Sequence, residues 1–405
     1  MGERTRADLQ YRQRLPLDIK IAMTRSRIRE WIGYYGEEGV YVSFSGGKDS
    51  TVLLDIVRRD YPNVPAVFVN IPTQYPELKR FVMTFDNVVI LRPKINFFQV
   101  CEKYGFPFFG KEIANCIHDA KIYLTKLEAR GCAATDRQTD RQTDSIKGAY
   151  AMADIQGIER RIKDPNRTKT YQELKVGNIP SEIIENAPVR VKQLYGKLKH
   201  KSKGVESNEY SKMYDKSQYA YMLDAPFDVS DMCCKEMKKK PLHKYNKKTG
   251  RVPITAQIAE ESRIRTSQWI KFGCNMFNAK DPKSNPMSFW TEQDVLRYIK
   301  DYKLEICSVY GEVVSDAEQM GQMNLSDFGI ENAEVQEKLH CTGCQRTGCE
   351  LCAFGAHMPG DKRFLNLKET HPQMYKALDV AKNNDYTMRQ ALEWINAQGK
   401  QHFDF

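Results

Sequence analysis

The residues best suited to chemistry form a short loop of glycine, lysine and hydroxyl side chains: Ser45, Gly46, Gly47, Lys48, Asp49, Ser50 and Thr51. Two successive glycines let a backbone turn with φ > 0 and bring bare N–H groups up to an anion. A helix that begins in the loop would add its partial positive charge. The lysine, the loop amides and the three hydroxyls are therefore candidates for contact with phosphate.

A second group of reactive side chains is a cluster of four thiols near the C-terminus: Cys341, Cys344, Cys349 and Cys352. Two Cys-x-x-Cys pairs this close together can bring four thiolates to one metal with little loop-closure cost. Spacing alone does not distinguish zinc from iron–sulfur ligation. The cluster therefore predicts a metal-binding region without naming the metal.

The phosphate loop lies between a predicted strand and a predicted helix. Residues 40–44 are β-branched or aromatic, as in a buried strand, and residues 52–57 give a helix with a broad apolar face. Further strands are expected at 66–70 and 88–91. Strands that alternate with helices indicate an α/β fold, a parallel twisted sheet with flanking helices, whose ligands lie beyond the carboxyl ends of the strands.

Other helices are expected on periodicity and capping signals. An amphipathic helix over 15–35 precedes the first strand and stops at Gly36, and another covers 111–131. Thr291, followed three residues later by Asp294, predicts a helix start. Two helices near 370–383 and 387–398 are expected to close the chain.

These patterns predict five regions. Residues 1–14 are polar and expected to be loose, and 15–130 form the nucleotide-binding α/β core. Residues 131–190 are an inserted, mobile region, because the repeat TDRQTDRQTD at 135–144 has no apolar side chain for a core. Residues 191–330 hold a basic segment and the rest of the core. Residues 331–405 hold the cysteines and C-terminal helices.

The charge is +10 over the whole chain, and 190–251 alone holds 16 Lys or Arg against 7 Asp or Glu. Such a segment suits a polyanion such as nucleic acid, although a solvated basic surface has the same composition. No apolar run approaches the ~20 residues that span a bilayer, and the N-terminus lacks a secretory signal. We expect a cytoplasmic protein whose 11 cysteines are thiols or metal ligands.

The loop resembles the SGGxDS pyrophosphate loop of ATP pyrophosphatases, which split ATP between its α and β phosphates. It is not the GxxxxGK[ST] loop, because Val42 stands where that motif needs glycine. The chain as a whole resembles the phosphoadenosine phosphosulfate (PAPS) reductase family, of adenine nucleotide α hydrolase-like fold. The matching blocks are SFSGGKDSTVLL at 43–54, TQYPE at 73–77, RPK at 92–94, YGFPFFGKE at 104–112, CCKEMKKKPL at 233–242, EESRIR at 260–265, PMSFWTEQDVLRYI at 286–299 and TGCELC at 347–352.

The resemblance implies roles for particular residues. Ser262 and Arg265 would face the reacting end of the nucleotide. Independently of the resemblance, the carboxylate of Asp49 could help to hold Mg²⁺, although a carboxylate there is also an ordinary helix cap. The family's adenylylsulfate reductases hold a [4Fe–4S] cluster with a tandem Cys-Cys and a distant Cys-x-x-Cys. The cysteines that match are Cys233, Cys234, Cys349 and Cys352, with Cys341 and Cys344 as a second set.

The local four cysteines at 341–352 remain an alternative ligand set, and Cys274 could replace one member of the tandem pair. The isolated cysteines are expected to be buried or bystanders: Cys101, Cys116, Cys132 and Cys307. His340 and His357 flank the cluster, and we expect them to be surface residues.

Three departures bear on the reaction. PAPS-cleaving reductases have a nucleophilic cysteine near the C-terminus, but no cysteine follows Cys352 here. They also tend to have a degraded phosphate loop, and this one is intact. The usual Gly-Leu-Arg-Arg is replaced by Gln-Ile-Ala-Glu at 257–260, so an expected sulfonucleotide arginine is missing.

Three functions remain open. The first is an ATP-dependent adenylating enzyme that has an iron–sulfur centre and takes part in sulfur transfer to nucleic acid. Its catalytic residues would be Lys48, Asp49 and Arg265. The second is a sulfonucleotide reductase whose nucleophile has moved to Cys341 or Cys344. The third is a non-catalytic nucleotide-binding or redox-sensing module. The acceptor, and whether the chain forms a homo-oligomer or needs a partner subunit, stay open.

Overall fold

The structure is a computed structural model that describes residues 4–135, 184, 186–202, 205–315 and 338–405. The chain divides into two compact units. The first unit comprises Met1–Phe97 and Cys234–Glu350, and the second comprises Phe98–Cys233 and Leu351–Phe405. The sequence had suggested boundaries near 130, 190 and 330, whereas the chain passes between the units after 97, 233 and 350.

A six-stranded sheet forms the centre of the first unit. Its order is β3-β2-β1-β7-β9-β8, and every pairing is parallel except that of β8 with β9. The strands are β1 (Val40–Ser43), β2 (Ala66–Val69), β3 (Val88–Leu91), β7 (Val252–Ile254), β8 (Asn275–Met276) and β9 (Lys283–Ser284). The predicted α/β fold with a mainly parallel sheet is confirmed.

The strand β1 lies at the point where the chain order reverses. Val42 pairs with Ala66 of β2 on one side and with Ile254 of β7 on the other. In open α/β sheets ligands bind at the carboxyl edge beside such a switch point. The loops that follow β1 and β7 lie at this carboxyl edge, and the loop after β1 is the glycine loop.

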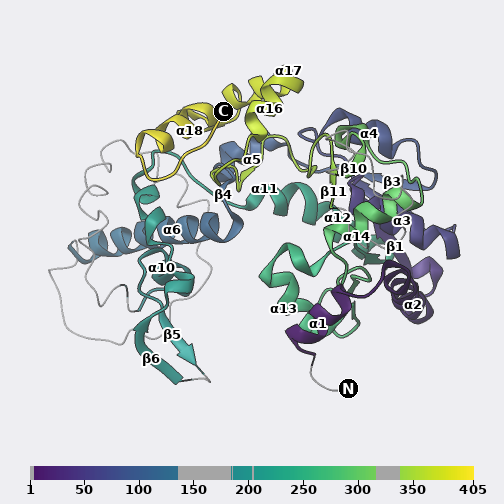
Figure 1. Ribbon diagram of the computed structural model, residues 1–405. Coiled ribbons are helices and arrows are strands. Elements are labelled where there is room, and N and C mark those ends of the chain that lie inside the picture. Colours follow the sequence, from purple (N-terminus) through teal and green to yellow (C-terminus); the bar gives the residue numbers. More distant parts are fainter. Residues whose placement is uncertain (1–3, 136–183, 185, 203–204, 316–337) are drawn as a thin grey trace, which may run out of the picture. The chain divides into compact units, whose positions relative to one another are not determined.

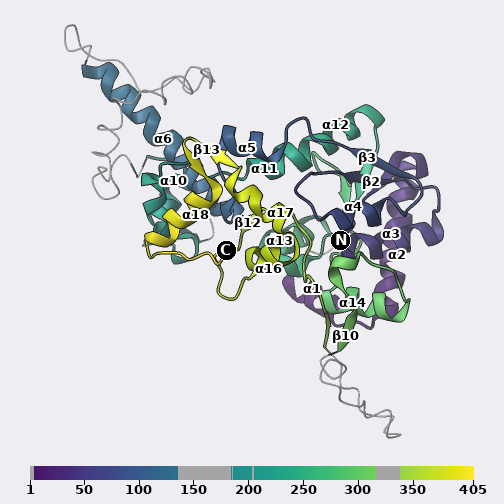
Figure 2. The same cartoon turned by 90° about the horizontal axis from the view of Figure 1, so that it is seen from above.

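Helices pack around this sheet (Figure 1). They are α1 (Arg6–Gln13), α2 (Leu17–Tyr35), α3 (Lys48–Asp60), α4 (Pro76–Val82), α12 (Lys240–Thr249), α13 (Arg263–Phe272) and α14 (Glu292–Asp301). The helices α2 and α3 lie side by side in both views (Figures 1 and 2). Trp31 of α2 and Val52 of α3 are fully buried in one hydrophobic core with Trp290.

Two helix starts show how local sequence acts. Thr291 and Asp294 form a capping box at the start of α14, as predicted. The expectation of a loose N-terminus is wrong for 6–13, because Thr5 and Asp8 form another capping box and Leu9 is buried. The sequence signal for that helix was Thr5, followed three residues later by Asp8 and then by the apolar Leu9.

The second unit is built from helices and short strands. Its elements include α5 (Phe97–Tyr104), β4 (Phe108–Phe109), α6 (Lys111–Thr135), α10 (Val189–Leu194), β5 (Lys199–Ser202), β6 (Val205–Tyr210) and β12 (Ala353–Phe354). The expected helix at 111–131 is confirmed as α6, and β12 pairs in parallel with β4. Buried aromatic rings of Phe106, Phe108 and Phe227 pack against one another here.

The C-terminal helices differ in part from expectation. The last is confirmed as α18 (Met388–Ala397), with Thr387 as its cap. The prediction of one helix over 370–383 is wrong. The chain there has three short helices, α16 (Arg363–Thr370), α17 (Pro372–Tyr375) and a 3₁₀ turn at 376–379, and then a strand. Pro372 begins a new helix because proline suits the first helical position.

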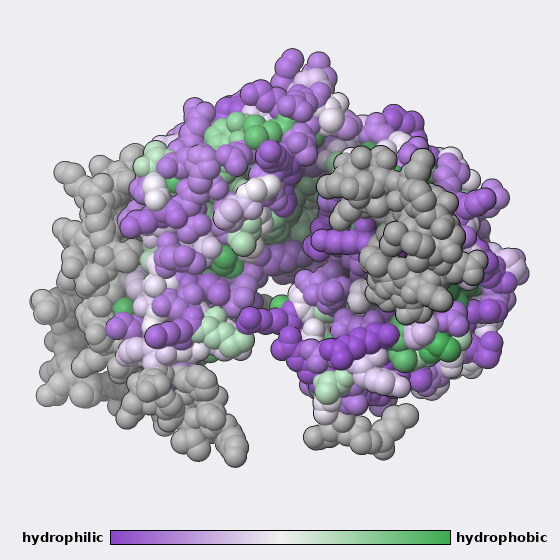
Figure 3. Space-filling view, viewed as in Figure 1, coloured by the Kyte–Doolittle hydropathy of each residue, from purple (hydrophilic) through white to green (hydrophobic). Residues whose placement is uncertain are grey.

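The predicted insertion at 131–190 and its TDRQTDRQTD repeat lie almost entirely outside the described residues. In the part of the chain that is described, no helix is both long and apolar enough to cross a membrane. Figure 3 shows hydrophilic side chains over most of the face in view.

Candidate functional site

The glycine loop joins the end of β1 to the first turn of α3. Gly46 has φ +75°, whereas Gly47, the N-cap of α3, has φ −77°. A Cβ on Gly46 would lie 2.9 Å from Cγ2 of Val82. The expectation that both glycines provide positive φ is therefore corrected: only Gly46 does, and it must also be glycine because α4 packs against it.

The hydroxyl groups of the loop mainly hold its shape. Ser45 Oγ and Ser50 Oγ are 3.0 Å apart, and Ser50 Oγ donates to the Gly47 carbonyl at 2.9 Å. Thr51 Oγ1 donates to the same carbonyl at 3.1 Å. Ser50 and Thr51 are buried whereas Ser45 is exposed. Of the three predicted hydroxyl contacts, Ser45 is thus the one open to a ligand.

Lys48 lies at the start of α3 with both its nitrogens engaged. Its backbone N–H donates to Tyr310 Oη at 3.2 Å, and its Nζ donates to the Gln345 carbonyl at 2.9 Å. Nζ also forms an ion pair with Glu292 Oε1 at 3.0 Å. Tyr310 Oη lies 2.5 Å from Thr347 Oγ1. A buried ammonium and an amide at a helix start are the groups that bind phosphate elsewhere.

Residues 342–350 run along the carboxyl edge of the sheet. The amides of Gly343 and Cys344 donate to the carbonyls of Tyr310 and Val309 at 2.9 and 2.8 Å. At the far end the Glu350 amide donates to the Thr73 carbonyl at 2.8 Å. This segment, which we call the edge segment (residues 342–350), therefore contacts the loops that follow both β1 and β2.

Charged side chains converge on Asp49 and Arg265. Burial raises the pKa of Asp49, although the charges of Lys48, Arg346 and Arg265 oppose that effect and Glu292 adds to it. Burial also lowers the pKa of Arg265, and Arg346 acts in the same direction. The two sequence-predicted residues, 216 positions apart, thus lie within electrostatic reach of each other.

The loop after β7 forms the other side of the site. Lys283 Nζ donates to Gln257 Oε1 at 3.1 Å, and Arg265 Nη1 donates to the Ile258 carbonyl at 3.5 Å. Ser262 Oγ accepts from the Arg265 amide at 3.3 Å as the N-cap of α13. The hydroxyl of Ser262 is therefore used as a helix cap, and Arg265 also pairs with Glu261.

Several residues of this site were not predicted from the sequence to take part in binding: Gln257, Lys283, Glu292, Tyr310, Gln345, Arg346 and Thr347. Lys283 begins the short strand β9 and Tyr310 ends a 3₁₀ turn at 308–310, and neither belongs to a recognisable motif. Only tertiary contacts bring them to the loop. Tyr310 is nearly fully buried, and burial raises its pKa to about 12, so the phenol is a neutral hydrogen-bonding group.

The cysteines do not assemble into a metal centre in the described parts of the chain, where no three His, Cys, Asp or Glu side chains are placed to hold an ion. Of the first predicted set, Cys234 and Cys349 belong to the first unit and Cys233 and Cys352 to the second. The local set includes Cys341, Cys344 and Cys349 of the first unit. The ligand sets, and the cluster itself, stay predictions.

Cys341 and Cys344 lie beside the phosphate loop. Cys341 is buried, and burial raises its pKa while the nearby charge of Lys48 lowers it. Cys344 Sγ lies 3.7 Å from Tyr75 Oη. Between the cysteines of the second pair, Glu350 is buried, and burial raises its pKa to about 7. The edge segment thus places thiols close to the lysine that we expect to contact phosphate.

The remaining sulfur and imidazole groups are mostly structural. The thiols of Cys101, Cys116 and Cys307 are buried, as expected of small apolar residues. Cys274, the possible substitute for one member of the tandem pair, is also buried. Cys132 has no described side chain. His357 departs from its expected surface position: it is half-buried, its Nε2 lies 3.2 Å from Tyr219 Oη, and its ring packs on Phe109.

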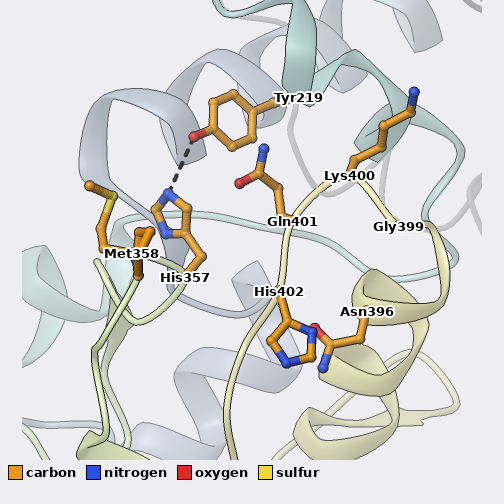
Figure 4. A pocket seen from close by; sticks show the side chains of 9 residues that line it. Tyr219, His357, Met358, Asn396, Gly399, Lys400, Gln401 and His402 are labelled. Carbon is orange, nitrogen blue, oxygen red and sulfur yellow. Dashed lines mark hydrogen bonds between the residues drawn. The ribbon is translucent and has the colours of Figure 1, made fainter.

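His357 forms part of a pocket of about 480 Å³ within the second unit (Figure 4). The pocket is lined by Tyr219, His357, Met358, Pro359, Asn396, Gly399, Lys400, Gln401 and His402. The two histidines come from separate segments of the chain, and Figure 4 shows the contact between His357 and Tyr219. Nothing in the sequence pattern predicted this pocket.

The fold and the glycine loop at its switch point define an α/β protein with a candidate phosphate site at the carboxyl edge of its sheet. The family model for the phosphoadenosine phosphosulfate reductase domain matches residues 39–170 and 175–354. The chain therefore belongs to the PAPS reductase family. It is an α/β protein of a family of enzymes that act on sulfonucleotides and related compounds.

A solved structure also matches the chain, the phosphoadenylyl-sulfate (PAPS) reductase from Candida auris in a phosphate complex. The two chains are 10% identical, and the match covers 79% of this chain and 94% of the other with a TM-score of 0.31. The family assignment rests on the sequence match over both parts of the domain.

Proposed function

We propose that this protein binds ATP at the SGGKDS loop and transfers AMP to an acceptor with release of pyrophosphate. The observation that carries the proposal is the start of α3 at Lys48, directly behind a glycine turn at the sheet's switch point. An intact loop of this kind suits a nucleotide that has β and γ phosphates to hold.

In the proposed reaction an oxygen of the acceptor attacks the α phosphorus of ATP. A new oxygen–phosphorus bond forms, the bond from the α phosphorus to the bridging oxygen breaks, and the electron pair leaves with pyrophosphate. The proton of the acceptor passes to solvent or to a nearby base. Positioning and stabilisation of charge on the leaving group supply most of the catalysis.

Lys48, the amides of Gly47 and Lys48, and Ser45 would contact the β and γ phosphates. For this, Lys48 would exchange its contacts with Gln345 and Glu292 for phosphate oxygens. Arg265 would face the α phosphate, and its proximity to Asp49 supports a place on the same side of the site. Ser262 would act by holding α13 in position.

Asp49 fits the predicted role in Mg²⁺ binding. Burial disfavours its ionised form, and a divalent cation beside a buried carboxylate would offset that cost. When bound, Mg²⁺ would neutralise the phosphates of the leaving group. Asp49 is also the acidic residue in the first turn of α3, so its removal would weaken the helix start as well.

An acceptor on nucleic acid, a [4Fe–4S] centre and a sulfur-transfer step belong to the same proposal. Family membership supports sulfur chemistry, and the basic segment supports a polyanionic acceptor. The reaction above involves no redox step, and so it does not depend on the cluster.

The test is anaerobic incubation with ATP labelled at the α phosphate together with candidate acceptors. The proposal expects labelled acceptor or AMP, equimolar pyrophosphate, and loss of both in Lys48→Ala. Lys303→Ala serves as a control because Lys303 is an exposed lysine of the same unit, outside the blocks that match the family. Pyrophosphate release unchanged in Lys48→Ala would remove the loop from the reaction.

A second candidate is reduction of a sulfonucleotide by a thiol of the edge segment. The observation in its favour is Cys344, which is partly exposed and lies near Tyr75 and the phosphate loop. A thiolate would attack the sulfur, the sulfur–oxygen bond to the nucleotide phosphate would break, and an external dithiol would then release sulfite and become a disulfide. Sulfite formed from PAPS and thioredoxin, and lost in Cys344→Ser, would favour this candidate.

A further inference from the structure

Helix α12 (Lys240–Thr249) carries a row of positive charge on its outer side. Lys240, Lys244 and Lys248 are spaced four residues apart and all are exposed, as is Lys247 beside them. Lys240 also forms an ion pair with Glu236 of the preceding turn at 2.6 Å, whereas its side chain stays 58% exposed. Positions four apart share one face of a helix and are separated by ~6 Å along its axis. The helix has no acidic residue and no fully buried residue.

The opposite face of α12 holds the helix against the sheet. Tyr41 of β1 donates to Asn246 Oδ1 at 2.8 Å, and its ring meets that of Tyr245 edge-on. Gly250 ends the helix with φ +73°, and the chain then enters β7 at Val252. The exposed lysines therefore lie on the side of α12 away from β1, and Figure 2 shows the helix itself at the outer edge of the unit.

The positive charge continues from α12 to the carboxyl edge of the sheet. Lys239 directly precedes α12 as its N-cap residue. Lys239 and Arg265 are both close enough to Lys283 for their charges to lower its pKa, in addition to burial. Lys283 contacts Gln257 in the loop after β7. The row of α12 therefore leads to the candidate site.

We propose that the phosphate backbone of a nucleic-acid strand lies along the row Lys240, Lys244 and Lys248 and leads toward Lys283 and Arg265, so that this strand carries the acceptor. The identity of the acceptor rests on the proposed AMP transfer, whereas the docking surface does not. Evenly spaced cations beside a phosphate site suit a chain of phosphates.

Two other polyanionic partners fit this surface less well. An anionic membrane would favour large apolar side chains among the lysines, and the exposed large hydrophobic residues of the described chain include none between 235 and 249. An acidic protein would offer no repeated charge to match the regular spacing of the lysines. Both are outcomes that the experiment distinguishes.

The test compares two triple variants in the full chain. The first is Lys244→Gln, Lys247→Gln and Lys248→Gln, which removes three exposed charges of α12. The control is Arg29→Gln, Lys271→Gln and Lys303→Gln, which removes three exposed charges elsewhere in the same unit. Melting temperatures close to that of the wild type in both variants would show that neither change unfolds the protein.

Binding of labelled single-stranded DNA and RNA of mixed sequence is measured without ATP over a range of salt. The proposal expects the α12 variant to lose about 1.4 to 1.8 from the slope of log affinity against log salt, since Lys244 and Lys248 belong to the row and each phosphate contact contributes ~0.7–0.9. The control should keep the wild-type slope. Equal losses in both variants, or equal affinity for polyglutamate or for anionic vesicles, would overturn the proposal.

The two proposals fail in different ways. If the α12 variant loses nucleic-acid binding but keeps its ATP affinity, the surface is separate from the nucleotide site, as we expect. If Lys48→Ala stops pyrophosphate release and nucleic acid never becomes labelled in the wild type, the surface remains a binding site but the strand is not the acceptor. If the wild type binds no nucleic acid at low salt, the surface proposal is wrong.

Discussion

The backbone N–H of Lys48 donates to the phenolic oxygen of Tyr310 at 3.2 Å, although 262 residues separate them in the chain. Tyr310 in turn shares a hydrogen bond with Thr347 of the edge segment. A phosphate bound at the start of α3 would compete with the phenol for this amide. The contact therefore connects the phosphate loop to the cysteine-rich part of the chain.

Tyr310→Phe should strengthen ATP binding by a few-fold, because the Lys48 amide then has no protein acceptor to give up. The same change should lower the free energy of unfolding by about 1–3 kcal/mol, as expected for the loss of two hydrogen bonds, those with Lys48 and Thr347. Calorimetry with ATP and urea unfolding measure the two effects. Weaker ATP binding would mean instead that the phenol contacts the nucleotide.

The two glycines should respond differently to alanine. Gly46→Ala should reduce stability by about 1–2 kcal/mol or more, because the residue has φ +75° and the new Cβ would press on Val82. Gly47→Ala keeps an allowed φ, and its Cβ would meet Tyr310 Oη at 3.2 Å. Ser45 Oγ and Thr347 Oγ1 would also lie 3.3 Å from the new Cβ, so Gly47→Ala should lower the melting temperature, but less than Gly46→Ala does. Gly47→Ala should weaken ATP binding, and Gly47→Val should abolish ATP binding. Normal ATP affinity in both Gly47 variants would contradict the phosphate-loop assignment.

Asp294→Ala should be strongly destabilising, by about 3–5 kcal/mol, since it leaves Lys20 as a buried charge without its partner. Lys20 Nζ lies 2.7 Å from Asp294 Oδ2, and the side chain of Lys20 is 3% exposed. Asp294 also completes the capping box of α14. Chemical unfolding measures the loss, and Asp301→Ala at the exposed end of the same helix is the control. A similar loss in both variants would count against the buried pair.

The half-buried His357 should make stability depend on pH. Burial lowers its pKa below the ordinary value of 6.5, with the charge of Arg363 acting in the same direction and that of Asp361 opposing. The unfolded chain then binds the proton more readily, so stability is complete above about pH 6.5 and is lost as the pH falls toward the folded pKa. Between about pH 7.5 and about pH 5 the wild type should lose more melting temperature than His357→Gln. Parallel curves would show that another group is responsible.

The cluster prediction is tested by iron content in protein purified without oxygen. One [4Fe–4S] centre would give about four iron atoms per chain. Under the ligand set that includes the tandem pair, Cys234→Ala and Cys349→Ala should both lose iron, whereas Cys341→Ala should keep it. Under the local set, Cys341→Ala and Cys349→Ala should lose iron and Cys234→Ala should not. Full iron in all three variants, or zinc in place of iron, would reject the iron–sulfur prediction.

The sequence by itself determined the elements that short-range physics governs. The apolar run before Ser45 and the apolar face after Lys48 specify a strand and a helix, and glycine at 46 is the residue that accepts the turn between them. The sequence also predicted the capping box of α14, because its two residues are only three positions apart. The family resemblance covered the same blocks, and the match to the family model confirmed it.

Only the tertiary structure decided which distant residues reach the loop. Tyr310, Glu292 and Gln345 contact Lys48 because the edge segment and α14 pack at the carboxyl edge of the sheet, and no local pattern encodes those contacts. The sequence showed that the segment of α12 is rich in lysine. The contacts of Tyr41 show which side of this helix meets the sheet, and therefore which side the lysines share. Local spacing sets backbone conformation through nearby sterics and hydrogen bonds, whereas long-range contacts depend on how whole elements bury their apolar faces.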